Sequence, residues 1–62
     1  MQITELNVGQ RVQLHPASDA WMSGDKYGEV VRVGRSIVHV KMDRSGRVRW
    51  FHPETIMEIV AA

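Results

Sequence analysis

Basic residues are concentrated in the middle of this chain. Between Arg32 and Arg49 there are six bases and one acid, Asp43, whereas the rest of the 62-residue sequence has two bases and six acids. The net charge of the whole chain is therefore only +1, although the charges are segregated. A segregated positive charge produces an oriented field that attracts an anionic partner. The competing interpretation is that charges on the polar faces of strands only keep the protein in solution.

Residue alternation separates the two faces of the strands that carry most of these bases. Side chains two positions apart on a strand lie on the same face of the sheet. In residues 36–42 one face receives Val38, Val40 and Met42, and in residues 47–51 one face receives Val48 and Trp50. We expect both apolar sets to face the core.

The opposite face of this hairpin is the main candidate binding site. It would carry a histidine, three cations and an aromatic residue at its end: His39, Lys41, Arg47, Arg49 and Phe51. Phosphate oxygens accept hydrogen bonds from lysine and arginine, and an aromatic ring can stack on a base. These residues predict a surface for an anionic partner, with nucleic acid as the first choice and an acidic protein as the second. An ordinary solvated face is the competing interpretation.

A second candidate is the segment 15–25, which we expect to be an ordered loop with an apolar anchor. Trp21 and Met22 lie in it and Tyr27 follows it. Aromatic residues and methionine suit contacts with a protein partner. We favour the competing interpretation, a small core beneath the loop, because tryptophan is largely buried in most proteins. For Trp50 a place in the core is expected even more strongly.

Catalytic and metal-binding patterns are absent from the sequence. There is no cysteine, and the three histidines, His15, His39 and His52, lack the spacing of metal ligands. No serine lies in a nucleophile elbow and no glycine-rich phosphate loop is present. We therefore expect no metal, no cofactor and no catalytic residue, and a binding module rather than an enzyme.

The N-terminal residues are polar, and no apolar run approaches the length of a membrane span. We expect a cytoplasmic protein with neither a signal peptide nor a membrane anchor. The absence of cysteine agrees with this expectation, since nothing points to an oxidising compartment.

Turn-forming residues divide the chain into five short strands. We expect them at residues 9–14, 27–33, 36–42, 47–51 and 56–60. Pro53 suits the first position of a single helical turn before the last strand. This order of elements matches an SH3-like barrel, an all-β fold that leaves few exposed sheet edges. We expect one such domain over residues 1–62.

Half of the chain resembles a known family of SH3-like modules. Residues 28–33 read Gly-Glu-Val-Val-Arg-Val and residues 38–43 read Val-His-Val-Lys-Met-Asp. The pattern of a glycine, a hairpin and a valine-rich return strand resembles the KOW type of module. That resemblance implies RNA, ribosomes or transcription proteins as partners.

A second resemblance is to the plasmid-type (type II) dihydrofolate reductases, short SH3-like chains that form tetramers around a pore. It lies in residues 9–12, in Trp21 with Gly24, in residues 48–51 with Pro53, and in residues 57–59. In that family the residues matching 48–51 read Val-Gln-Ile-Tyr and line the pore. Here they read Val-Arg-Trp-Phe, and four arginines at a pore centre would repel one another. This resemblance implies a homo-oligomer, and a reductase-like protein is a further alternative to a binding module.

Overall fold

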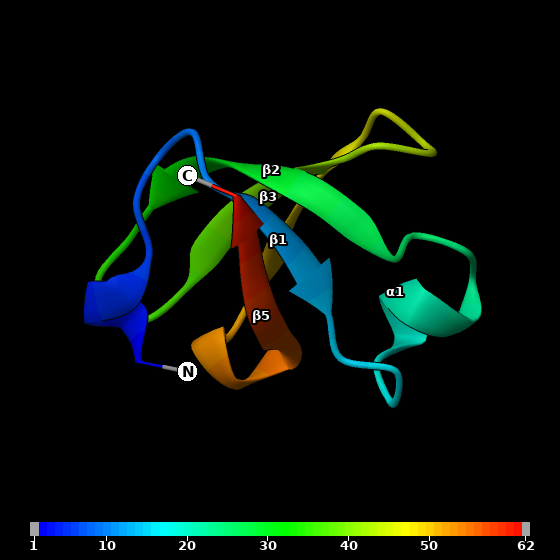
Figure 1. Ribbon diagram of the computed structural model, residues 1–62, viewed down its shortest axis with the longest axis horizontal. Coiled ribbons are helices and arrows are strands. Elements are labelled where there is room, and N and C mark those ends of the chain that lie inside the picture. The colour runs from blue at the N-terminus through cyan, green and yellow to red at the C-terminus, as the bar shows by residue number, and fades with distance from the viewer. Residues whose placement is uncertain (1, 62) are drawn as a thin grey trace.

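Five strands make one antiparallel sheet in the computed structural model, which describes residues 2–61 (Figure 1). The strands are β1 (Arg11–Leu14), β2 (Tyr27–Val33), β3 (Val38–Met42), β4 (Val48–Phe51) and β5 (Ile56–Ala61). They lie in the order β4-β3-β2-β1-β5, and a 3-10 turn, η2 (Pro53–Thr55), comes directly before β5. The predicted all-β class, with five strands and one helical turn before the last, is confirmed. β4 and β5 end the strand order.

Two further short helices lie outside the sheet. One is η1 (Ile3–Glu5), and the other is α1 (Asp19–Met22), which occupies part of the segment expected to be a loop. Ser18 caps α1, because its Oγ accepts a hydrogen bond from the backbone N–H of Trp21 at 3.2 Å. No helix in the range 2–61 is long and apolar enough to span a membrane.

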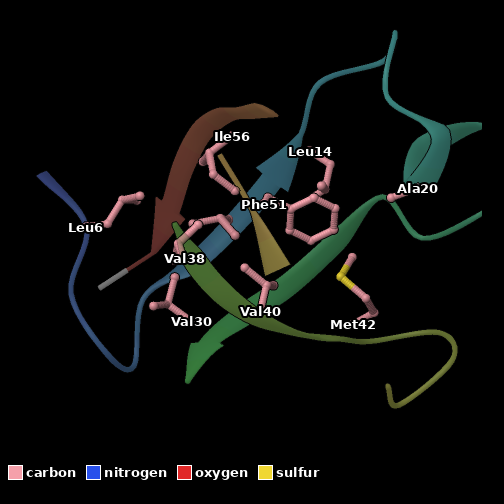
Figure 2. Packing of buried hydrophobic residues seen from close by; sticks show 10 residues of the cluster. Leu6, Leu14, Ala20, Val30, Val38, Val40, Met42, Phe51 and Ile56 are labelled. Carbon is pink, nitrogen blue, oxygen red and sulfur yellow. The ribbon is translucent and has the colours of Figure 1, made fainter. Parts of the chain in front are cut away.

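The core lies on one face of the strongly curved sheet (Figure 2). Its buried members come from every strand, from α1 and from the residue directly after η1: Leu6, Val12, Leu14, Ala20, Val30, Val38, Val40, Met42, Phe51 and Ile56. The predicted inward side of β3 is therefore confirmed. β2 and β3 approach closely at Gly28, where a Cβ atom would lie 2.7 Å from the carbonyl oxygen of Lys41.

The predicted phase of β4 is wrong. Val48 and Trp50 were expected in the core, but they are 56% and 59% exposed, whereas Phe51 is only 8% exposed. In the β3–β4 register Val38 lies opposite Phe51 and Val40 lies opposite Arg49. Residues directly opposite in neighbouring strands share a face, so Arg49 and Phe51 are on the core side.

A physical reason favours the observed phase. Phenylalanine has no polar atom, whereas a buried tryptophan needs a hydrogen-bond partner for its indole N–H. Arg49 tolerates the inward side because β4 ends the sheet and its guanidinium reaches a carboxylate on the neighbouring segment. Figure 2 shows the Phe51 ring among the buried side chains of the core.

Candidate anion-binding site

The outer face of β3 and β4 carries only part of the predicted cationic cluster. Trp50 lies opposite His39, and Val48 lies opposite Lys41. On the other side of β3, Lys41 faces Glu29 of β2. This face therefore combines apolar side chains, a histidine and charges of both signs, rather than the predicted group of three cations and a histidine.

Arg47 and Arg49 lie elsewhere, in a hollow between the β3–β4 turn and the segment after α1. The hollow is lined by Ser23, Asp25, Arg44, Ser45, Arg47, Val48 and Arg49. Thus the structure keeps Arg47 with Arg49 but separates both from the face that carries His39 and Lys41. It also adds Arg44, which is not among the predicted site residues.

The hollow that contains Arg44, Arg47 and Arg49, here called the arginine hollow, is lined by one carboxylate. This carboxylate is almost completely buried. Asp25 is 8% exposed, and its Oδ2 accepts a hydrogen bond from Ser45 Oγ at 3.2 Å. The same oxygen lies 3.8 Å from a guanidinium nitrogen of Arg49. Arg49 also lies over the Phe51 ring, 5.6 Å from its centroid. Arg49 is thus held from two sides, and the hollow keeps an excess of positive charge.

Arg44 rests on the chain just after α1. Gly24 has a φ of +101°, and a Cβ atom at that position would collide with the Arg44 guanidinium. The backbone conformation therefore favours glycine, and any side chain here would also displace the Arg44 guanidinium. This contact brings Arg44 from the β3–β4 turn back over the segment that carries Asp25.

A second hollow adjoins the first along β4. Its lining comes from β4 and η2 on one side and from the α1 region on the other: Ala17, Ser18, Asp19, Ala20, Arg49, Trp50, Phe51, His52 and Thr55. The Trp50 and His52 rings meet at 89° with their centroids 5.8 Å apart. Because Arg49 lines both hollows, we treat them as one surface, the β4 groove, with an arginine half and an aromatic half.

The second predicted site combines one half-buried residue with exposed ones. Trp21 is half-buried against the core, while Met22 is 77% exposed. The Tyr27 ring lies 6.4 Å from that of Trp21, and the Lys26 ammonium lies 5.2 Å from the Trp21 centroid. Trp21 is thus an anchor for the loop, as the competing interpretation proposed, whereas Met22 and Tyr27 are exposed.

Within residues 2–61 no three histidine, cysteine or carboxylate side chains come together as a metal site. Comparisons with protein-family models, with curated proteins and with solved structures find no match to this chain. Function is therefore inferred from the geometry of the β4 groove.

Proposed function

We propose that this protein is a non-catalytic binding module for nucleic acid and that the arginine half of the β4 groove receives the phosphates. The observation that carries the proposal is the presence of Arg44, Arg47 and Arg49 around a hollow with a single, buried carboxylate. Guanidinium groups match phosphate oxygens in geometry as well as in charge.

The existing ion pairs leave two of these arginines available. Among residues 2–61 the ion pairs are Arg11–Asp43 and Arg49–Asp25. Arg44 and Arg47 therefore have no carboxylate partner in this range, and both are exposed. Neighbouring cations without a counter-ion repel one another, and a bound phosphate relieves that repulsion.

A second candidate function, contact with another protein, is favoured by the exposure of Met22. A methionine side chain that is 77% exposed suits an apolar contact with a partner. Such a complex would persist at high salt and weaken in Met22→Ala. A homo-oligomer, the third alternative, would be detected by light scattering of the purified chain.

The test of nucleic-acid binding is a fluorescence-anisotropy titration of a labelled oligonucleotide of about 12 nucleotides. Affinity is measured between about 50 and 200 mM salt, because each phosphate contact contributes roughly 0.7 to the logarithmic salt slope for a single strand. Removing both available arginines, in Arg44→Ala with Arg47→Ala, should weaken binding and reduce the slope by about 1.4.

Arg35→Ala is the matched control. Arg35 is exposed in the turn between β2 and β3 and is not among the residues that line the groove. A general effect of net charge would weaken binding per arginine as much at position 35 as at 44 and 47. That result, or binding that does not change with salt, would contradict the proposal.

A further inference from the structure

We infer that the ligand is a single strand of nucleic acid, with one unpaired base on Trp50 and the adjacent phosphate in the arginine half of the β4 groove. This inference rests on the proposed function and adds the kind of nucleic acid and the residue that contacts its base. The contact to the base is assigned to Trp50 because the fold leaves this side chain exposed.

Trp50 is exposed although its neighbour in sequence, Phe51, belongs to the core. Its indole is flanked by the His52 ring, which meets it at 89°, and His39 lies directly opposite on β3. These neighbours restrict the indole without covering it. Every base has an aromatic face that can stack on such a ring, whatever the sequence.

The arginines would contact the same ligand across the edge of the sheet that β4 forms. Along β4, Arg49 lies on the core side and Trp50 on the outer side. β4 is an edge strand of the sheet. A ligand that passes over the free edge of β4 therefore contacts Trp50 on one face and the arginine hollow on the other. Trp50 would thus contact the base, while the hollow beside Arg49, with the available Arg44 and Arg47, would receive the phosphate.

A single strand fits this path better than a duplex. In a duplex the faces of the bases are covered by stacking, and the double helix is stiff over roughly 150 base pairs. A single strand bends sharply and offers its bases to aromatic side chains. In addition, the helices of residues 2–61 are three or four residues long, too short to read the major groove of DNA as a recognition helix does.

Trp50 fluorescence provides a direct readout. The sequence has two tryptophans, so Trp21→Phe leaves Trp50 as the only indole. This variant is titrated with a thymine oligonucleotide, a uracil oligonucleotide and a DNA duplex of the same length. We expect both single strands to quench the Trp50 emission at concentrations where the duplex does not.

Substitution of Trp50 tests the stacking contact separately. In the otherwise natural chain, Trp50→Ala should weaken single-strand binding about 5- to 150-fold, the range for loss of one stacked base. Trp50→Phe keeps a ring and should recover much of the affinity. Met57→Ala removes another exposed apolar side chain, on β5, and should leave binding unchanged. Circular dichroism verifies that each variant is folded.

The outcomes separate this inference from the proposed function. Equal affinity for duplex and single strand, or full affinity in Trp50→Ala, overturns the stacking model; if Arg44→Ala with Arg47→Ala still weakens binding, nucleic-acid binding itself stands. Failure of the natural chain to bind any of the three oligonucleotides at low salt overturns both.

Discussion

Arg49 lies 3.8 Å from the buried carboxylate of Asp25 and connects the outermost strand β4 to the segment between α1 and β2. The pair has two effects of opposite sign. It holds β4 against the segment after α1, and it places a negative charge inside the arginine hollow. A change at Asp25 should therefore move stability and anion binding in opposite directions.

Asp25→Asn is the first prediction. The amide oxygen can still accept the hydrogen bond from Ser45, but the attraction to Arg49 is lost, so the free energy of unfolding should fall by about 1–2 kcal/mol. With the carboxylate gone, the hollow is more positive, and the affinity for an oligonucleotide at low salt should rise. Urea unfolding and anisotropy titration measure the two changes.

Glu58→Gln is the control for net charge, because Glu58 is an exposed carboxylate on β5. It should leave stability nearly unchanged and raise affinity less than Asp25→Asn does. Equal gains in affinity from the two variants would show that Asp25 acts only through the total charge.

The phase of β4 gives a second prediction. Phe51→Leu removes part of a buried ring and should lower the free energy of unfolding by about 1–3 kcal/mol. Trp50→Leu changes an exposed side chain and should alter it by no more than about 0.5 kcal/mol. Urea unfolding of both variants measures the difference. A larger loss for Trp50→Leu would mean that the tryptophan is the buried residue.

β4 also shows what residue alternation in the sequence does not predict. On β3, valines and methionine alternate with polar residues, so only one phase buries the apolar set, and that phase was correct. On β4 each phase offers an aromatic residue, Trp50 or Phe51, and alternation alone does not choose between them. The choice depends on the indole N–H and on Arg49 reaching Asp25, a contact between residues far apart in the sequence.

Only part of the candidate site could be predicted. Alternation put Arg47 and Arg49 on one face, and both line the arginine hollow, whereas His39 and Lys41 lie on the other face of the hairpin. Arg44 was missed because it lies in the turn, where strand alternation gives no direction. Its place over Gly24 results from how the turn folds back on the segment after α1.

Close approach of β2 and β3 gives a third prediction. In Gly28→Ala the new methyl group would lie 2.7 Å from the Lys41 carbonyl oxygen and 2.5 Å from Val40 Cγ1. The strands must separate locally, at a cost of about 1–3 kcal/mol. Gly34→Ala, whose methyl group would lie 3.1 Å from the Ile37 carbonyl oxygen, should cost less. Denaturation midpoints that fall equally in the two variants would contradict a specific contact at Gly28.

The contact between Gly24 and Arg44 gives the last prediction, which joins stability to binding. In Gly24→Ala the methyl group strains a backbone with positive φ and also displaces the Arg44 guanidinium. In an Arg44→Ala background only the backbone strain remains. Urea unfolding of the four proteins in this cycle should therefore give a coupling energy within about 0.5–3 kcal/mol. Gly24→Ala should lower the free energy of unfolding less when Arg44 is absent.

Oligonucleotide affinity should follow the same pattern, because a displaced Arg44 no longer lines the hollow. Gly24→Ala should weaken binding in the natural background and have little effect in the Arg44→Ala background. Stability changes that add to within about 0.5 kcal/mol would show that Arg44 does not rest on Gly24. Affinity changes that add would remove Arg44 from the proposed phosphate site.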